Sequence, residues 1–255
     1  MINIMYMGQK PIGELCFRQL VSMKGEKLNI KALVSNQSRD KVWWKTNNIY
    51  KYALENQIPF IDNEARNFDK IIELIKEKEI NFIISVGHNW IISEDILALV
   101  NYKAVNLHLA KLPEYQGNFT FNHAILNGEK EYGVTLHWMQ REVDEGDYLF
   151  IPVFPIEEND TAFSLYNKSL DEGQKVFHVF IEYLLNDKEL PRKKMAGKKC
   201  FYDRHSLDGL REIENVNDIK LLKRKSNAFY FPPFENAYVK IDGKKYYVIP
   251  DNENK

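Results

Sequence analysis

Side chains that can move a proton or stabilise a negative charge gather in two stretches of the sequence. Asn106 and His108 stand two residues apart in an apolar run at 104–109 that predicts a strand, so we expect them on one face of it. Asp144 follows in the segment 143–147. An amide N–H, an imidazole that titrates near neutral pH and a carboxylate that orients the imidazole can together stabilise an oxyanion and relay a proton.

Other interpretations of these residues stay open. A histidine on a strand is more often a hydrogen-bonded structural residue than a catalytic one. His108, His137 and Asp144 would also suit a metal ion, although their spacing matches no standard metal-binding motif. His88 follows an apolar run beside Gly87, where it either lines a site or serves the structure.

Several common active-site motifs are missing from the sequence. It has no GxGxxG, Walker A, HExxH or GxSxG motif, which argues against a dehydrogenase, a P-loop kinase, a zinc protease and an α/β-hydrolase. Cys16 and Cys200 belong to no CxxC pair or His/Cys cluster, so neither a disulfide scaffold nor a zinc ribbon is expected.

The composition is that of a globular protein with balanced charge. The 255 residues are 44% hydrophobic, and 35 Lys and Arg against 36 Asp and Glu give a net charge of −1 at pH 7. Such a balance argues against indiscriminate nucleic-acid binding. The apolar run at 2–7 has no basic segment before it and predicts a strand rather than a signal peptide, and no apolar stretch is long enough to cross a membrane. We therefore expect a cytoplasmic protein without nucleic-acid or membrane partners.

Short apolar runs alternate with amphipathic stretches over the first half of the chain. Strands are expected at 2–7, 30–34, 59–61, 82–86 and 104–109, with helices at 12–23, 48–56, 68–79 and 91–99 between them. This rhythm is typical of a parallel sheet with helical crossovers, and such sheets bind ligands at the carboxyl ends of their strands, where Asn106 and His108 fall. The sequence thus predicts an α/β fold with a Rossmann-like, mostly parallel sheet.

The second half has a different pattern. Extended segments are expected at 132–139 and 148–156, and a long helix at 161–185. Residues 1–187 carry an excess of acidic side chains, whereas residues 188–255 carry 16 Lys and Arg against 10 Asp and Glu and end with a hairpin signal around Asp242-Gly243. We expect a catalytic domain at 1–187 and a small C-terminal α/β domain at 188–255, whose hairpin offers an interface for a homodimer.

The order and spacing of the polar segments resemble those of the folate-dependent formyltransferases. The shared pattern covers residues 1–185 and reads Asn106-x-His108, Leu112-Pro113-x-Tyr115-x-Gly117, Thr135-x-His137 and Asp144-x-Gly146. This resemblance implies that Asn106, His108 and Asp144 are catalytic, that 10-formyltetrahydrofolate is the formyl donor, and that no metal takes part.

The resemblance also implies where the donor binds, and the strand ends indicate where the acceptor binds. The pterin of the donor is expected at the segment 85–90 and along the loop 139–144, at Val86, Gly87, His88, Trp90, Met139 and Val143. The acceptor is expected beside the same strand ends, at Lys10, Asn118, Phe119 and Thr120, with further contacts from Gln116 and Gly117 of the shared pattern and from Tyr230 of the tail. Lys10 would contact a phosphate unless it is a solvated surface residue. Tyr230 lies in an aromatic run that would stack on a base, pack internally or join a dimer.

Departures from the family pattern and the length of the tail bear on the acceptor. The family commonly has Ser at the position of Ala110 and Arg at that of Gln116, and an uncharged amide cannot make the anion contact of a guanidinium. The tail is shorter than the C-terminal barrel of methionyl-tRNA formyltransferases and resembles the short C-terminal region of nucleotide-sugar N-formyltransferases.

The function that this resemblance implies is N-formylation of a nucleotide-linked amino-dideoxy sugar. The favoured acceptor is dTDP-4-amino-4,6-dideoxyglucose, used for a surface polysaccharide such as lipopolysaccharide O-antigen. Three alternatives stay open. A methionyl-tRNA formyltransferase would use a nucleic-acid acceptor, a formyltetrahydrofolate hydrolase would use water, and a non-catalytic module would only bind a nucleotide.

Overall fold

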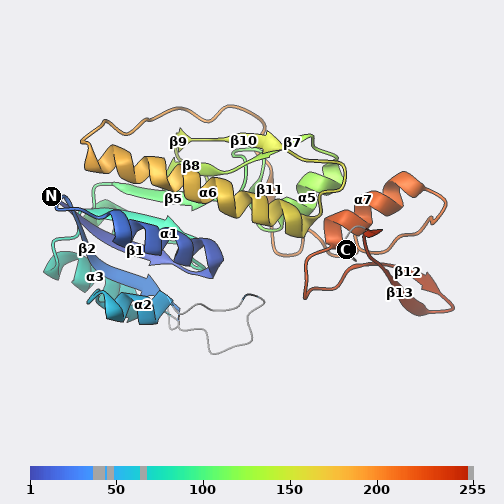
Figure 1. Cartoon of the computed structure of the whole chain (residues 1–255), viewed down its shortest axis with the longest axis horizontal. Coiled ribbons are helices and arrows are strands. Elements are labelled where there is room, and N and C mark those ends of the chain that lie inside the picture. Colours follow the sequence, from blue (N-terminus) through green and yellow to red (C-terminus); the bar gives the residue numbers. More distant parts are fainter. Residues whose placement is uncertain (37–43, 45–48, 64–67, 252–255) are drawn as a thin grey trace. The chain divides into compact units, whose positions relative to one another are not determined.

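The computed structural model describes residues 1–36, 44, 49–63 and 68–251 (Figure 1). They form two compact units, each assembled from separate stretches of the chain. The first unit comprises Met1–His108, Val134–Pro152 and Leu170–Ala196, and the second comprises Leu109–Gly133, Val153–Ser169 and Gly197–Lys255. The division into a catalytic domain at 1–187 and a C-terminal domain at 188–255, expected from the sequence, stays a prediction.

A seven-stranded sheet forms the centre of the first unit (Figure 1). Its strands lie in the order β3-β2-β1-β4-β5-β8-β9. Their bounds are β1 Ile2–Gly8, β2 Leu28–Ser35, β3 Phe60–Asp62, β4 Phe82–Val86, β5 Ala104–His108, β8 Thr135–Trp138 and β9 Tyr148–Phe150. β1 to β5 pair in parallel, whereas β8 and β9 pair antiparallel to their neighbours. The predicted α/β fold with a mostly parallel sheet is therefore confirmed.

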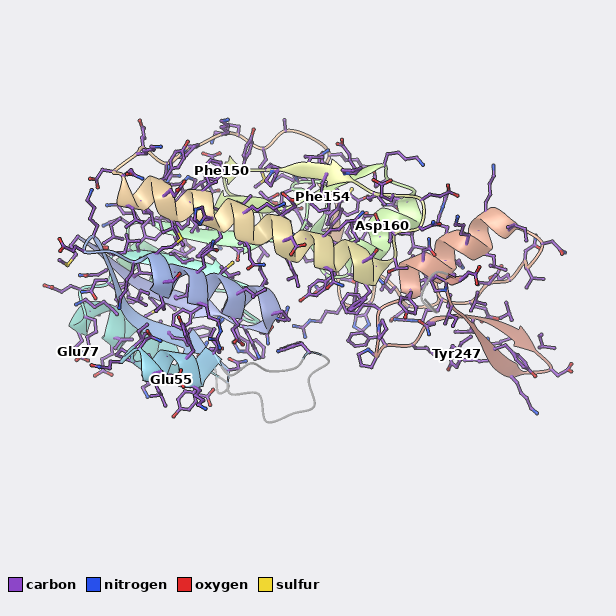
Figure 2. The ribbon with its side chains drawn as sticks, in the orientation of Figure 1. Glu55, Glu77, Phe150, Phe154, Asp160 and Tyr247 are labelled. Carbon is purple, nitrogen blue, oxygen red and sulfur yellow. The ribbon has the colours of Figure 1, made fainter. Side chains whose placement is uncertain are left out.

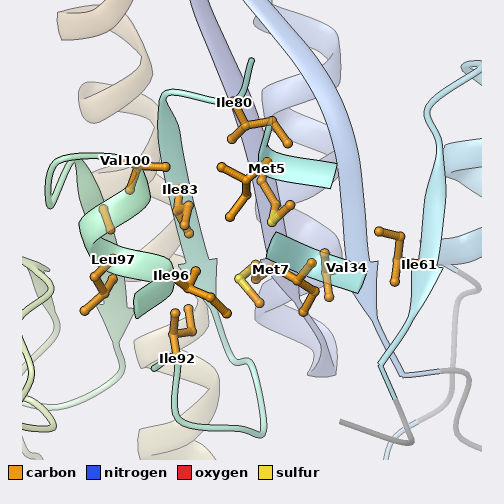
Figure 3. Packing of buried hydrophobic residues seen from close by; sticks show 13 residues of the cluster. Met5, Met7, Val34, Ile61, Ile80, Ile83, Ile92, Ile96, Leu97 and Val100 are labelled. Carbon is orange, nitrogen blue, oxygen red and sulfur yellow. The ribbon is translucent and has the colours of Figure 1, made fainter. Parts of the chain in front are cut away.

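Helices cover both faces of this sheet. They are α1 (Lys10–Met23), α2 (Ile49–Glu55), α3 (Phe68–Glu77), α4 (Glu94–Leu99) and the part of α6 (Ala162–Leu185) that belongs to this unit. On β1, the Tyr6 ring packs near Phe17 of α1 and Phe177 of α6, at centroid distances of 5.1 and 6.4 Å. Its neighbour Met5 packs on the other face of the sheet, in a core with residues of α3 and α4 such as Ile96 (Figure 3). Strands buried on both faces in this way are apolar along nearly their whole length, as β4 is apart from Ser85.

Two helices, α4 and α6, differ in how their N-termini are capped. α4 begins at Glu94 rather than at residue 91, after Ser93 in an extended conformation, which corrects the prediction. α6 begins one residue after Thr161. Thr161 Oγ1 accepts the Ser164 N–H at 3.0 Å while Ser164 Oγ accepts the Thr161 N–H at 2.9 Å, a reciprocal cap. No helix in the described part of the chain is long and apolar enough to cross a membrane.

The second unit holds the shorter elements. They are β6 (Gln116–Gly117), α5 (Thr120–Asn127), β7 (Glu131–Gly133), β10 (Val153–Pro155), β11 (Phe201–Tyr202), α7 (Ile219–Phe229), β12 (Ala237–Ile241) and β13 (Lys244–Val248). The strands pair two by two, β10 with β7, β11 with β6 and β12 with β13. Tyr132, Leu165 and Phe229 are among the buried residues of the core of this unit.

The C-terminal hairpin forms as predicted. Asp242 and Gly243 connect β12 to β13 with φ angles of +48° and +75°, as the two-residue turn of a tight hairpin requires. Tyr246 and Tyr247 are 51% and 55% exposed, and Figure 2 labels Tyr247 on β13. The hairpin therefore carries large aromatic side chains on its surface.

The extended segments expected at 132–139 and 148–156 are each divided into two strands, which corrects the prediction. β8 and β9 extend the large sheet, whereas β7 pairs with β10 in the second unit. Pro152 lies between β9 and β10, and proline has no N–H with which to continue a ladder. Its carbonyl oxygen accepts the N–H of Val134, the residue that separates β7 from β8, at 3.2 Å.

Candidate active site

β5 carries the two polar side chains at the centre of the candidate site. Asn106 and His108 are partly exposed, whereas Val105 and Leu107 are buried, so the strand alternates as predicted. His108 is the last residue of the strand. β5 lies between β4 and β8, which puts Asn106 directly opposite His137. Asn106 and His108 therefore share a face toward the end of the strand at which open sheets bind ligands.

Asp144 faces both histidines from the loop after β8. Its carboxylate oxygens lie 3.8 Å from His108 Nδ1 and 3.7 Å from His137 Nε2. These distances suit ion pairs with a protonated imidazole but are longer than direct hydrogen bonds. The Asp144 and His108 side chains are 9% and 15% exposed, so salt screens their attraction less than on an open surface. The structure thus brings Asn106, His108 and Asp144 together within the first unit.

A carboxylate between two imidazoles is the main electrostatic feature of this cluster. Among the described residues, no three His, Cys, Asp or Glu are arranged to hold a metal ion. His108 and His137 instead each face one oxygen of Asp144. This geometry suits the orientation of an imidazole and the transfer of a proton.

The loop that carries Asp144 requires a glycine at residue 146. A Cβ atom at residue 146 would lie 1.6 Å from the carbonyl oxygen of Trp138, which leaves room only for glycine. The Trp138 N–H donates to the Asp147 carbonyl oxygen at 2.8 Å and ties the far end of the loop back to β8. The close approach of the loop to β8 thereby sets the position of Asp144.

His137 makes contacts within the site that the sequence does not predict. It is buried on β8, with Nε2 3.1 Å from Asn106 Nδ2 and Nδ1 3.0 Å from the Trp138 carbonyl oxygen. Burial lowers the pKa of His137 to about 4, and the nearby Asp144 carboxylate opposes that shift only in part. The imidazole is therefore neutral at pH 7. The Thr135-x-His137 spacing was the available signal, but it does not reveal the register that sets His137 against Asn106.

The segment after β4 lies beside the start of α1. Gly87 has a φ of +62°, and a Cβ there would lie 2.6 Å from the Gln9 carbonyl oxygen, so the two backbones approach closely. His88 Nε2 is buried and finds no hydrogen-bond partner in the part of the chain that the structure describes. Burial and then the charge of Lys10 lower the pKa of His88 to about 4, so this ring is also neutral at pH 7.

The other residues expected to hold the donor lie in the same unit. Val86 ends β4 and is buried, and Trp90 is half-buried in the following turn. Met139 packs against the core beneath α3 and α4, while Val143, next to Asp144, is exposed. Their roles in donor binding stay predictions.

The residues expected to hold the acceptor are divided between the two units. Lys10 belongs to the first unit and has a φ of +65°. Gln116, Gly117, Asn118, Phe119, Thr120 and Tyr230 belong to the second. There, Gln116 and Thr120 are buried, and Thr120 Oγ1 accepts the Tyr132 hydroxyl at 2.8 Å. Phe119 is 41% exposed with a φ of +55°, and Tyr230 caps the carboxyl end of α7. Their binding roles stay predictions.

A segment beyond the expected domain boundary also supports the strand next to the site. The Arg192 guanidinium lies 3.9 Å from the centroid of the Trp138 ring, whose Nε1–H donates to the Pro191 carbonyl oxygen at 2.9 Å. The backbone of Lys193 forms an antiparallel β-bridge with the backbone of Tyr148 in β9. Residues 191–193 therefore continue the first unit past β9, a contribution that the compositional boundary at 187 did not indicate.

Comparison with known proteins assigns the chain that carries this site to a family. Residues 4–181 match the model of the formyl transferase family. The chain belongs to that family. The matched stretch includes Asn106, His108, His137 and Asp144. The resemblance and the class of enzyme predicted from the sequence are therefore confirmed.

Relatives in the formyl transferase family include enzymes named for different acceptors. A methionyl-tRNA formyltransferase from Clostridium tetani is 32% identical over 205 residues, which are 79% of this chain and 65% of that enzyme. A GDP-perosamine N-formyltransferase from Brucella melitensis is 32% identical over 184 residues, which are 72% of this chain and 70% of that enzyme. The match thus spans less than two thirds of the length of the first relative.

A formyl transferase of known structure shares the fold. WlaRD, a sugar 3N-formyl transferase solved in the presence of dTDP and 5-N-formyl-THF, superimposes with a TM-score of 0.74 at 25% sequence identity. The match covers 96% of this chain and 84% of WlaRD. The fold predicted for this family is therefore confirmed.

Proposed function

We propose that this protein transfers the formyl group of 10-formyltetrahydrofolate to the amine of a nucleotide-linked amino sugar. The observation that carries the proposal is the grouping of Asn106, His108 and Asp144 at β5 in a chain of the formyl transferase family. WlaRD and the GDP-perosamine enzyme, both named for sugar acceptors, support the acceptor class. The product is a formamido sugar, which we assign to a surface polysaccharide such as O-antigen.

The residues that follow β4 and β8 suit the folate donor. His88 has a buried, neutral ring nitrogen without a partner among the described residues, and such a group is costly unless a ligand satisfies it. A pterin ring offers several hydrogen-bond donors and acceptors. We assign donor binding to Val86, Gly87, His88, Trp90, Met139 and Val143. The donor supplies the activated one-carbon group.

Asn106 and His108 act on the charge that develops when the neutral amine attacks the formyl carbon. As the new C–N bond forms, the Asn106 amide and protonated His108 donate hydrogen bonds to the formyl oxygen, which becomes an oxyanion. Asp144 orients His108 and stabilises its positive charge from 3.8 Å. The amine loses its proton through these groups, and the tetrahydrofolate nitrogen takes up a proton as its bond to the formyl carbon breaks.

The acceptor that we favour is a dTDP-linked 4-amino-4,6-dideoxyhexose. The dTDP present with WlaRD supports a thymidine nucleotide. Lys10 brings the positive charge that a diphosphate requires. It follows the carboxyl end of β1, and because β1, β4 and β5 are parallel, this end lies on the same side of the sheet as His108 at the carboxyl end of β5. The remaining contacts are assigned to Gln116, Gly117, Asn118, Phe119, Thr120 and Tyr230.

The protein is further proposed to act as a cytoplasmic homodimer. The β12–β13 hairpin exposes Ile241, Tyr246 and Tyr247, and exposed apolar side chains on a short sheet favour self-association. Cys16 and Cys200 are free thiols, which suits a reducing compartment.

Formylation of methionyl-tRNA is the second candidate function. The Clostridium tetani relative supports it, and the excess of Lys and Arg over acidic residues in 188–255 favours contact with RNA. The net charge of −1 over the whole chain opposes it.

Mass spectrometry of a reaction panel tests the proposal. Purified protein and 10-formyltetrahydrofolate are mixed with dTDP-, GDP- and UDP-linked amino sugars, with methionyl-tRNA, and with no acceptor. We expect one amino sugar to gain the mass of a formyl group. Formylation of methionyl-tRNA alone would establish the second candidate instead. Loss of the donor at an equal rate without acceptor would indicate a hydrolase, and no turnover at all would indicate a binding module.

Replacement of Gly146 with alanine is expected to lower kcat by about 10²-fold, because the added Cβ displaces the loop and misplaces Asp144. Ser22→Ala is the control, since Ser22 is exposed in the last turn of α1 and its side chain donates only to the nearby Gln19 carbonyl oxygen. Steady-state kinetics and thermal unfolding of both variants measure the effect. Full activity in Gly146→Ala would show that the position of Asp144 is not critical.

A further inference from the structure

The role assigned to Asn106 depends on which end of its side-chain amide faces the reaction. The nitrogen Nδ2 carries two N–H groups and can stabilise an oxyanion, whereas the oxygen Oδ1 only accepts hydrogen bonds and would repel one. A rotation of the amide by 180° about χ2 exchanges the positions of Nδ2 and Oδ1, and the strand backbone does not favour either orientation. A neighbouring group that can only accept, or only donate, a hydrogen bond favours one of the two orientations of the amide.

His137 is such a neighbour. Its Nδ1 lies 3.0 Å from the Trp138 carbonyl oxygen, which only accepts, so the proton of the neutral ring is on Nδ1. Nε2 then carries a lone pair, 3.1 Å from Asn106 Nδ2. An acceptor at this position favours the amide nitrogen over the amide oxygen. The cross-strand pairing of residues 106 and 137 holds the two side chains at this separation.

We therefore propose that His137 is a positioning residue: it accepts one N–H of Asn106 and so fixes the amide with its nitrogen in place, leaving the second N–H for the oxyanion. The catalytic meaning of this contact rests on the proposed formyl transfer, whereas the orientation of the amide does not. His137 acts through Asn106 and has no contact with the reacting atoms in this mechanism.

The charged groups around His137 are consistent with a neutral acceptor. Asp144 faces Nε2 from the loop after β8 at 3.7 Å, and His108 faces the ring from β5. Burial lowers the pKa of His137 most, Asp144 and the hydrogen bond to the Trp138 backbone raise it, and His108 lowers it, with a result of about 4. Protonation below that pH would put a hydrogen on Nε2, which would then donate to Asp144 and repel the N–H of Asn106.

Kinetics of paired variants test the positioning role. His137→Leu removes the acceptor, so we expect kcat to fall about 10²-fold while the KM values for donor and acceptor stay close to those of wild type. His137→Gln keeps an oxygen that can accept from Asn106 and is expected to recover most of that loss. In an Asn106→Ala background, His137→Leu should cause almost no further loss, because the group that it positions is gone. His205→Leu, at an exposed histidine, is the matched control.

An additive result would overturn the proposal. If His137→Leu lowered kcat as much in the Asn106→Ala background as in wild type, His137 would act independently of Asn106. Wild-type kinetics in His137→Leu would overturn it as well.

Nitrogen NMR of the histidine rings in the wild-type protein tests the contact without any loss of fold. The His137 signals are assigned by their absence from His137→Gln. We expect Nδ1 to be protonated and Nε2 unprotonated between about pH 5 and 8, whereas a free histidine titrates in this range. An Nε2–H tautomer or an imidazolium at neutral pH would overturn the proposal. If the wild-type protein formylates nothing in the acceptor panel, the proposed function fails, and the ring tautomer still decides the orientation of Asn106.

Discussion

Replacement of Asn106 with alanine is expected to lower kcat for formyl transfer by about 10²–10³, with little change in KM for either substrate. The loss of one oxyanion donor typically removes about 2.7–4 kcal/mol of transition-state stabilisation. Asn106 is a partly exposed residue of β5, and the pairing of β5 with β4 and β8 uses backbone groups that the substitution leaves in place. The fold should therefore persist.

Asn186→Ala is the matched control for this variant. Asn186 is exposed just after α6, where its side chain donates to the Glu182 carbonyl oxygen, and its loss should leave kcat unchanged. Steady-state kinetics and circular dichroism of both variants separate catalysis from folding. Near-normal turnover in a folded Asn106→Ala variant would remove Asn106 from the mechanism.

The second large effect is expected at Asp144. Asp144→Asn keeps the size of the side chain but removes the negative charge that lies 3.8 Å from His108 and 3.7 Å from His137. Because His108 loses the group that orients it and stabilises its charged form, kcat should fall by about 10²–10⁴, the usual contribution of acid–base groups. Steady-state kinetics under saturating donor and acceptor measure this loss.

A surface His–Asp pair provides the control for Asp144→Asn. His205 Nδ1 and Asp208 Oδ2 lie 3.1 Å apart, and both side chains are largely exposed, so their attraction contributes little. Asp208→Asn should leave kcat unchanged. If Asp144→Asn were as active as Asp208→Asn, the carboxylate between the two histidines would have no part in proton transfer.

The two histidines beside Asp144 lie in different surroundings. The His137 side chain is 3% exposed, its pKa is lowered to about 4 by burial, and it serves as a neutral acceptor in the account given above. His108, at the end of β5, is more exposed and is assigned the charged, donating role. Environments that differ in this way let one pair of identical side chains perform opposite tasks.

Much of the sheet that carries the site follows from local patterns. β4 is apolar at every position except Ser85 because it is buried on both faces, and its bounds, Phe82–Val86, match the prediction. The alternation within β5 places Asn106 and His108 on one face whatever strands pair with it. The turn at Asp242-Gly243 is equally local, since it depends on the φ angles of only two residues.

The features that the sequence did not predict depend on contacts between distant residues. His137 meets Asn106 only in the register that β5 and β8 adopt. The segments 132–139 and 148–156 are divided between two sheets because of the partners that each strand meets. The need for glycine at residue 146 arises from the Trp138 carbonyl oxygen, which approaches it only in the folded chain.

Formyl transfer to an amino sugar can be observed by following the formyl carbon itself. The protein is incubated with 10-formyltetrahydrofolate labelled with ¹³C in the formyl group and with a dTDP-linked 4-amino-4,6-dideoxyhexose, and the products are followed by NMR. We predict a labelled formamide on the sugar, formed about 10²–10³ times more slowly by the Asn106→Ala variant. Label that appears only as formate, at the same rate with and without the amino sugar, would contradict the assignment of this protein as a sugar N-formyltransferase.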